Sequence, residues 1–313
     1  MEALSVKPKI TCIVDNAVQS SSRLWGEHGL AFLVEIGDGR VLFDTGQSGT
    51  VLLHNLAVLG VDPATIDALA ISHAHYDHTG GLPALLERAS CPSLPFYAHP
   101  GLFRERFARR GERPEFIGLP LAREALEAQT ALRLSAEPQQ ILPGVWTTGE
   151  IASRPEPVGD SPHHLVREGE VWVPDLYQDD MALVVEGAAG LVLLCGCCHA
   201  GLLNTLSHVQ RAFERPIVAI AGGTHLAGAS PDHLRRVGQT LLEMEPVQRV
   251  PESLFGQSRV SVFVTRVGAR HRAPLPGGDL SGLLRGDTPN ERNHRSRSMH
   301  RLRRVLRRLP RCL

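Results

Sequence analysis

Apolar runs of strand length recur over about the first 250 residues, separated by turns and by segments with helical spacing. Six of these runs predict strands: residues 9–15, 30–36, 41–43, 182–186, 191–194 and 217–221. Asp38-Gly39 marks a hairpin turn, and residues 187–190 join a second strand pair. Helices alternating with hairpins favour an α/β (α+β) fold, in which mixed sheets are faced by helices.

Helical spacing predicts helices over residues 49–59 and 231–245. Residues 102–134 also contain Arg- and Glu-rich segments with helical spacing, interrupted at Pro114 and Pro120. Four arginines lie near the start of this region: Arg104, Arg106, Arg109 and Arg110. They could grip an anionic substrate, but a solvated helix face is the use we expect for such charges.

A further apolar run, residues 66–72, leads directly into His-Ala-His-Tyr-Asp-His at positions 73–78. Side chains two apart in extended chain point the same way, so His73 and His75 can converge on one metal ion. Asp77 and His78 lie where the chain turns toward a helix, so they can face a second ion. The alternative is a histidine-rich surface loop, which the strand before the motif and the glycine turn after it disfavour.

This donor set predicts a centre of two divalent ions, with zinc as the first choice and manganese or iron as alternatives. Two such ions activate a water molecule and polarise a carbonyl or phosphoryl oxygen. Asp77 would hold that water and pass its proton on, which makes Asp77 the candidate catalytic residue.

The segment HAHYDHTGGL resembles the metal-binding signature of the metallo-β-lactamase superfamily. Within it, the chain is similar to the branch named after a ribofuranosylaminobenzene 5′-phosphate synthase of methanopterin biosynthesis, whose bacterial members are mostly described as metal-dependent hydrolases. Other segments carry the same likeness: residues 27–30, 43–46, 97–100, 149–151, 179–183, 195–201 and 222–226. The likeness covers about residues 8–250 and implies an αββα four-layer sandwich with its metals at one edge, between the sheets.

The resemblance also implies roles for residues outside the first motif. Asp44 resembles a superfamily aspartate that supports the metal-site loop through hydrogen bonds, so it is expected beside the ligands rather than among them. The histidine that usually completes the first ion's set is replaced by aspartate within residues 179–183. Either Asp180 or His199 therefore takes that role.

A second motif, Cys195-Gly196-Cys197-Cys198-His199, follows an apolar strand as the first motif does. In many superfamily members the corresponding strand ends in Gly-Asp, whose aspartate bridges the two ions, and Cys197 stands at that position. His199 lies two residues further on the same side of an extended chain, and we favour it as a metal ligand. Cys197 is a weaker ligand candidate, with a buried structural thiol as the alternative.

Two more histidines are candidates for contact with metal or substrate. His225 follows the predicted strand 217–221 and a glycine pair that allows close approach to a ligand. His28 is a similar case, and a capping or core histidine is the alternative reading. His163 and His164 lie in a stretch with proline and glycine and are expected to be solvated.

The chain changes character at residue 266. Residues 266–313 hold 13 arginines and three acidic residues, which give a net charge of +10. Because the whole chain has a formal net charge of zero, the preceding residues carry −10. We therefore predict a metallo-β-lactamase-like domain over residues 1–265 and an Arg-rich tail over residues 266–313. The His-Cys-Thr-Gly-like segment that the resemblance places after the helix 231–245, with the last metal histidine, is absent.

Two hypotheses account for the tail. High arginine without lysine and weak periodicity favour a disordered or frameshifted C-terminus. The rival is an authentic basic arm that binds nucleic acid or an acidic partner, which the lack of aromatic residues after Phe263 disfavours.

Apolar runs stop short of the roughly 18 residues that a membrane-spanning helix requires, so no membrane partner is expected. The first nine residues lack the apolar stretch of a signal peptide, so we expect a cytoplasmic protein.

The metal motifs and the resemblance leave three function classes. The first is a metal-dependent hydrolase of a small ester, lactone, thioester or phosphoester. The second is a pterin-related synthase that condenses a pterin diphosphate with an arylamine, and the third is a catalytically impaired binding protein. The third follows from the missing last histidine.

Overall fold

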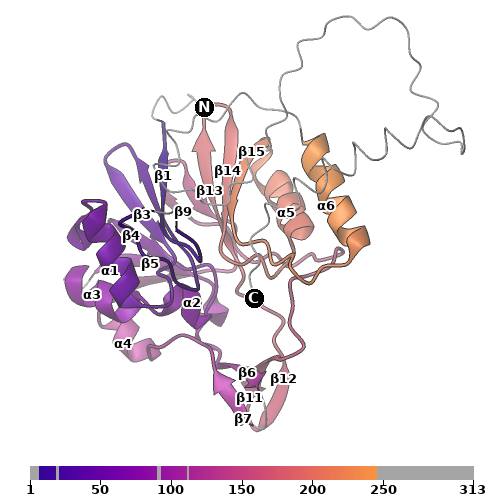
Figure 1. Ribbon diagram of the computed structural model, residues 1–313, viewed down its shortest axis with the longest axis horizontal. Helices are drawn as coiled ribbons and strands as arrows, with labels where there is room; N and C mark the ends of the chain where they lie inside the picture. The colour runs from indigo at the N-terminus through magenta and orange to yellow at the C-terminus, as the bar shows by residue number, and fades with distance from the viewer. Residues whose placement is uncertain (1–6, 19–20, 90–92, 111–112, 245–313) are drawn as a thin grey trace, which may run out of the picture.

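Two central β-sheets pack face to face in the computed structural model, which describes residues 7–18, 21–89, 93–110 and 113–244 (Figure 1). The first sheet has the strand order β1-β2-β3-β4-β5-β8. Its strands are β1 (Lys9–Val14), β2 (Ala31–Ile36), β3 (Gly39–Phe43), β4 (Ala68–Ala70), β5 (Leu94–Ala98) and β8 (Thr130–Leu134). The predicted hairpin is confirmed, because β2 and β3 pair antiparallel with Ile36 opposite Gly39.

The second sheet has the strand order β15-β14-β13-β10-β9. Its strands are β9 (Gln140–Leu142), β10 (Val145–Thr147), β13 (Ala182–Gly187), β14 (Gly190–Cys195) and β15 (Ile217–Gly222). The predicted pairing of β13 with β14 is confirmed, with Gly187 opposite Gly190. Parallel pairing of β14 with β15 brings Cys195 opposite Gly222, so both strands end at the same edge of the sheet.

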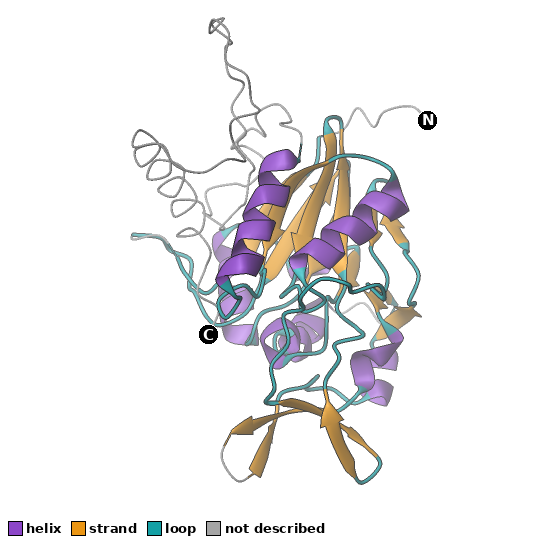
Figure 2. Ribbon diagram, turned by 90° about the vertical axis from the view of Figure 1, so that its right-hand side faces the viewer, coloured by secondary structure: helices purple, strands orange, loops and turns teal. Residues whose placement is uncertain are grey.

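Helices cover the outer face of each sheet, on opposite sides of the molecule (Figures 1 and 2). The first sheet is covered by α1 (Gly49–Val58), α3 (Leu82–Ala89) and α4 (Arg123–Glu127), and the second by α5 (Leu202–Phe213) and α6 (Pro231–Glu243). The predicted helices at residues 49–59 and 231–245 correspond to α1 and α6. Three short helices lie in connections: η1 (Pro63–Thr65), α2 (Tyr76–Thr79) and η2 (Pro100–Phe103).

Within the part of the chain that the structure describes, the buried apolar side chains form three clusters, one for each space between neighbouring layers. Leu33 and Leu42 of the first sheet pack with Leu52 of α1. Their strand neighbours point the other way, into the space between the sheets, where Phe32 and Phe43 pack with Leu183 and Val192 of the second sheet. A third cluster joins the second sheet to α5 and α6. The αββα four-layer sandwich is therefore confirmed.

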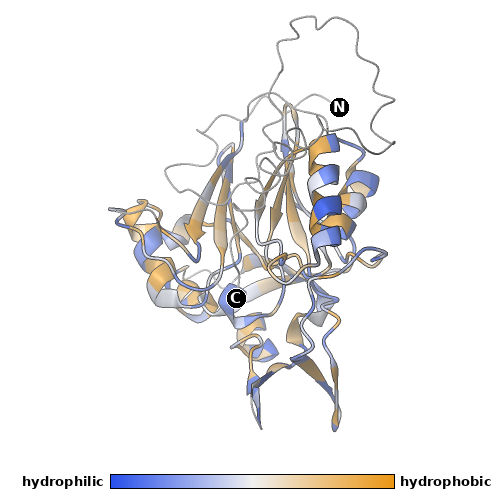
Figure 3. Cartoon of the chain, turned by 45° about the vertical axis from the view of Figure 1, so that its right-hand side comes forward, coloured by the Kyte–Doolittle hydropathy of each residue, from blue (hydrophilic) through white to orange (hydrophobic). Residues whose placement is uncertain are grey.

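Figure 3 agrees with this layering. The strands of both central sheets are largely hydrophobic, whereas the covering helices carry hydrophobic and hydrophilic residues on different sides. Among the described residues, no helix is both long enough and apolar enough to cross a membrane.

A small third sheet projects from one end of the sandwich (Figure 1). Its strand order is β12-β11-β6-β7, and its strands are β6 (Arg106–Arg110), β7 (Arg113–Phe116), β11 (His164–Glu168) and β12 (Val171–Pro174). The predicted helical content of residues 102–134 is therefore largely wrong, because α4 is the only α-helix of the described part of that region and has five residues. Burial alternates along β6, where Arg106 and Ala108 are more buried than Phe107 and Arg109. Because an arginine occupies one of the inward positions, the sequence shows no apolar strand period there.

Three predictions concern residues outside the described part of the chain. These are the domain boundary at residue 265, the nature of the tail over residues 266–313, and the place of a last metal histidine after α6. They stay predictions.

Candidate metal centre

The first motif lies where it was expected, directly after a strand of the first sheet. Its loop leaves β4 at Ala70 and enters α2 at Tyr76, so His73 and His75 lie in the loop, and Asp77 and His78 lie in the helix. All four candidate ligands are buried, with exposed fractions of 1% to 6%. The histidine-rich surface loop is therefore excluded. Residues 72–78 are called the first wall below.

Side-chain contacts of the first wall orient the histidine rings. His78 Nδ1 lies 2.7 Å from Asp44 Oδ2, and Ser72 Oγ donates to the same oxygen at 2.8 Å. Ser72 Oγ can then accept from His73 Nδ1, 2.9 Å away. Both rings have their Nδ1 atoms engaged, which directs the Nε2 atoms toward the site. Asp44 has the supporting place that the sequence suggested.

His73 and His75 approach each other as the alternation of extended chain predicts. His73 Nε2 lies 3.1 Å from His75 Nδ1. Two nitrogens bound to one zinc ion at 2.0–2.1 Å in tetrahedral geometry lie about 3.3 Å apart, so this spacing suits shared coordination.

The two glycines after the motif, Gly80 and Gly81, lie against the backbone of a neighbouring loop. A Cβ on Gly80 would lie 2.0 Å from Gln47 O, and one on Gly81 would lie 2.3 Å from Thr45 O. These glycines therefore let the turn from α2 to α3 lie against the backbone that follows Asp44.

The second motif follows β14 in the opposite sheet, and residues 196–201 are called the second wall below. His199 is 1% exposed, and its Nδ1 lies 2.6 Å from the carbonyl oxygen of Gly159, which leaves Nε2 for the site. Tyr177 stacks on the His199 ring at 4.1 Å with an angle of 5° between the planes. Gly196 has no room for a side chain, because a Cβ would lie 2.1 Å from Ser72 Oγ. The second wall therefore fits closely against the first.

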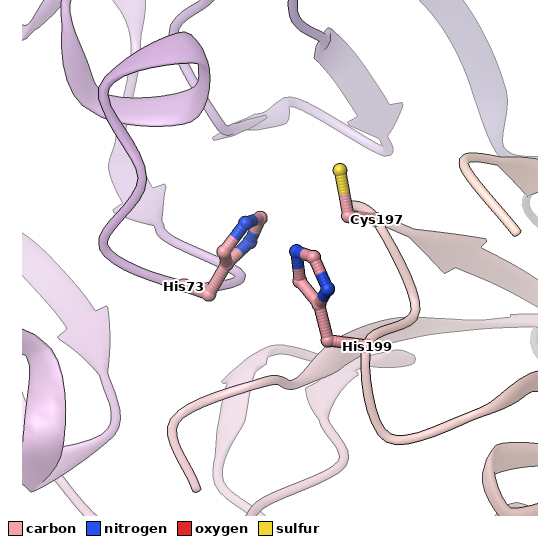
Figure 4. Close-up of side chains that lie close together, drawn as sticks. All are labelled: His73, Cys197 and His199. Atoms are coloured by element: carbon pink, nitrogen blue, oxygen red, sulfur yellow. The ribbon is translucent and has the colours of Figure 1, made fainter. Parts of the chain in front are cut away.

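Donor atoms of the two walls converge into two groups. His73, Cys197 and His199 form one group, and Asp77, His78 and Cys197 form the other, with the donor atoms of each group within 4.8 Å of one another. His75 belongs to neither group, although its Nδ1 lies 3.1 Å from His73 Nε2 of the first group. Figure 4 shows the imidazoles of His73 and His199 next to each other, with Cys197 in the same strand-end loop as His199. Cys197 is half-buried, and its sulfur lies 3.1 Å from His78 Nε2.

Two consecutive aspartates brace the walls from the loop before β13. Asp179 Oδ2 accepts from the backbone N–H of Ala74 at 2.9 Å, and Asp180 Oδ2 accepts from that of Ala200 at 2.7 Å. Each aspartate therefore fixes the backbone next to a histidine of one wall. Asp180 was one of two candidates for the role of the missing histidine. It belongs to neither donor group, whereas His199, the other candidate, belongs to the group with His73 and Cys197.

Arg106 differs from the solvated residue that the sequence suggested. It is 1% exposed, and its guanidinium pairs with Asp175 at 2.9 Å and with Asp179 Oδ1 at 2.6 Å. The small sheet is thus linked through Arg106 and Asp179 to the first wall. Arg104, by contrast, lies nearer the surface and pairs with Glu168.

Four aromatic side chains surround the donor groups. His28 Nε2 lies 3.5 Å from Asp77 Oδ2, and the ring of His225 lies 4.4 Å from that of His199, so both residues lie beside candidate ligands. Their contact with metal or substrate stays a prediction. Sequence reasoning missed Tyr177 and took His164 for a solvated residue. His164 lies 5.1 Å from His75 between ring centroids, and its Nδ1 lies 3.0 Å from the Tyr177 hydroxyl. Leu165 and Val166, which follow His164 directly, are the apolar residues that could have indicated a strand beginning there.

Burial and neighbouring charges set the protonation of the site. Burial lowers the pKa values of His73, His75 and His199 well below the ordinary range, so these rings are neutral, as metal ligands must be. Burial acts to raise the pKa of Asp77, but the charge of His78 and the hydrogen bond from its ring hold that pKa well below its usual value. Asp77 is therefore a carboxylate at neutral pH.

The donor set fits divalent metal ions. The Nε2 atom of His199 is buried without a hydrogen-bond partner among the described residues. A buried polar atom without a partner is costly, and coordination of a metal would satisfy it. Imidazole, thiolate and carboxylate donors together suit zinc and related ions.

Comparisons with known proteins agree with this arrangement. The family model of the metallo-beta-lactamase superfamily matches residues 24–172. The chain is 29% identical over 240 residues to a 7,8-dihydropterin-6-methyl-4-(beta-D-ribofuranosyl)-aminobenzene-5′-phosphate synthase of Methanocaldococcus jannaschii. This match covers 72% of this chain and 80% of the relative. It is 30% identical over 229 residues to an uncharacterized protein of the same organism, covering 73% of this chain and 83% of that protein.

One solved structure is similar over most of its length. The crystal structure of Tm1679, described as a metal-dependent hydrolase of the beta-lactamase superfamily, superposes with a TM-score of 0.63 at 26% sequence identity. The match covers 79% of this chain and 90% of that structure.

Proposed function

The chain belongs to the metallo-β-lactamase superfamily, and from that premise we propose that it is a metal-dependent hydrolase of a small ester, lactone, thioester or phosphoester. The observation that carries this proposal is the convergence of buried donors from two strand ends, one in each sheet, into two adjoining groups. We propose His73, His75 and His199 as ligands of one ion, and Asp77 and His78 as ligands of the other. Zinc is the first choice, with manganese or iron as alternatives.

Bound ions would lower the pKa of a water molecule and polarise an oxygen of the substrate. The residues of the chain supply the rest of the chemistry. Asp77, ionised and buried, would hold that water through one carboxylate oxygen and accept its proton. His28 Nε2 lies 3.5 Å from Asp77 Oδ2, and its side chain is 42% exposed, so it can carry the proton from Asp77 to solvent.

Orientation of the ligands is the task of residues around them. Asp44 directs the ring of His78 and, through Ser72, that of His73. The stacked ring of Tyr177 and the Gly159 carbonyl hold His199. Ligands held in this way need little reorganisation when a substrate reacts.

A synthase is the second candidate, because a relative that is 29% identical over 240 residues carries a synthase name. The corresponding reaction here would join a pterin diphosphate to an arylamine and release diphosphate. The same ions and the same two walls would serve either reaction, since the fold and the metal site host more than one chemistry.

The test is a hydrolysis screen on zinc-loaded protein with ester, lactone, thioester and phosphoester substrates, alongside the pterin condensation. The variant His75→Ala should lose at least about 100-fold in kcat/KM on whichever substrate reacts, because removal of a ligand impairs the metal centre. His54→Ala is the matched control, since His54 lies on α1 and stacks on Trp25 away from both walls.

Metal content, measured together with turnover, distinguishes the two enzyme candidates from the remaining alternative, a binding protein with an impaired site. Two ions per chain together with turnover of a hydrolysis substrate would support the proposal. Turnover of the pterin substrates alone would favour the synthase. No ions and no turnover would leave the binding protein.

A further inference from the structure

Cys197 is the donor shared by both groups. Its sulfur lies within 4.8 Å of the donor atoms of His73 and His199 on one side and of Asp77 and His78 on the other. Two ions in a binuclear site lie roughly 3.5–4 Å apart. Because a zinc–sulfur bond is about 2.3 Å long, one sulfur atom can reach two ions at that separation.

Close backbone packing fixes the position of Cys197. A Cβ on Gly196, the preceding residue, would lie 2.1 Å from Ser72 Oγ, and a Cβ on Gly223 would lie 3.0 Å from the Cα atom of Cys197. The N–H of Gly223 also donates to the Gly196 carbonyl at 2.8 Å. With glycine on both sides, the loop lies against the first wall and presents the Cys197 side chain to its histidines.

The neighbouring cysteines have a different place. Cys195 and Cys198 are buried in the apolar cluster between the second sheet and its helices. Cys198 Sγ lies 3.3 Å from Thr205 Oγ1 of α5. Cys197 is half-buried and lies 3.1 Å from His78 Nε2 instead. Cys195 and Cys198 are therefore buried structural thiols. Cys197 is not, because its sulfur lies beside the histidines of the first wall.

We propose that the Cys197 thiolate bridges the two metal ions. This inference rests on the proposed two-ion centre and adds to it the identity of the shared ligand. A coordinating thiol is deprotonated, so it contributes one negative charge, as a bridging carboxylate would. Sulfur is the softer donor, and the site should consequently favour zinc and cadmium over manganese.

Cadmium NMR distinguishes a bridge from a terminal ligand. The full-length protein is freed of metal, loaded with ¹¹³Cd and examined for stoichiometry and chemical shift. Cadmium bound to thiolate sulfur resonates well downfield of cadmium bound only to nitrogen and oxygen. A bridge predicts two ions per chain with both resonances in the thiolate range. A single downfield resonance, or none, with two ions bound would overturn the bridge and leave the proposed function standing.

Two variants complete the experiment. Cys197→Asp should still bind two ions, with both resonances shifted upfield into the range of nitrogen and oxygen ligands. Cys198→Ser, the matched control, should keep both resonances of the unmodified protein, because its side chain faces Thr205. Fewer than two ions in the unmodified protein would count against the two-ion centre itself, and so against the bridge as well.

Discussion

The two walls of the candidate centre are held in different ways. In the first wall, the carboxylate of Asp44 orients His78 directly and His73 through Ser72. In the second wall, His199 is oriented by a backbone carbonyl and by a stacked ring, both from the segment that leads from β10 to β13. The rings of His73 and His78 are thus oriented from their own sheet, whereas the ring of His199 depends on a long connection folding over it.

The supports of the two walls also differ in charge. Asp179, which holds the first wall, is paired with Arg106, and Asp180, which holds the second, leaves Oδ1 without a hydrogen-bond partner among the described residues. Two neighbouring carboxylates with similar tasks therefore have different electrostatic surroundings.

Removal of the charge beside Asp179 should have the largest effect. Arg106→Met leaves the buried carboxylates of Asp175 and Asp179 without their partner, and we expect the free energy of unfolding to fall by about 3–5 kcal/mol. Urea unfolding of the metal-free protein measures this loss in the free energy of unfolding. Arg104→Met is the control, since an exposed pair contributes about 0–1 kcal/mol. Equal losses in the two variants would contradict the role assigned to Arg106.

The unpaired carboxylate should make stability depend on pH. Burial raises the pKa of Asp180 to about 7, so the folded protein keeps a proton that the unfolded chain has released above about pH 4. Stability contributed by this group is therefore lost as pH rises from about 4 to 7. Asp180→Asn should be more stable than the unmodified protein, by a margin that grows over this window and then levels off.

The measurement is urea unfolding of the metal-free protein at several pH values. Asp67→Asn, an exposed carboxylate next to β4, serves as control. A margin for Asp180→Asn that shrinks as the pH rises would reverse the predicted sign.

The carboxylate behind the first wall should control metal affinity. Asp44→Ala removes the acceptor that orients His78 and Ser72, and we expect zinc affinity to fall about 10- to 100-fold. Competition with a chromophoric chelator gives the affinity. Asp67→Ala should leave it unchanged. An Asp44→Ala protein with unaltered affinity would show that the ligands need no such support.

Removal of the Tyr177 hydroxyl should have the smallest effect on stability. Tyr177→Phe keeps the ring on His199 but loses the contacts with His164 and with the Ser161 N–H, for an expected loss of about 0.5–1.5 kcal/mol in stability. Thermal unfolding detects this loss, and metal affinity should stay within about twofold. A large fall in affinity would mean that the hydroxyl, and not the ring, holds the second wall.

Sequence reasoning located the first wall because its ligands are contiguous and follow an apolar strand. Spacing of two between His73 and His75 predicts their convergence, and the layered fold follows from the strands and helices around them. His199 and Cys197 could be placed at a strand end for the same reason. That they meet the first motif depends on the packing of one sheet against the other, which no local pattern encodes.

The support of the second wall could not be predicted. Arg106 looked like a solvated residue because its sequence neighbours are charged, and its burial depends on aspartates about 70 residues away. His164 and Tyr177 reach the site through the small sheet and the connection after it. Tertiary contacts of this kind leave no periodic signal in the chain.

Anomalous diffraction from zinc-loaded crystals tests the central claim most directly. The account predicts two zinc peaks between the walls, one beside His73, His75 and His199 and the other beside Asp77 and His78, with the Cys197 sulfur between them. Zinc peaks elsewhere, or imidazoles of the two walls turned away from a shared space, would contradict it.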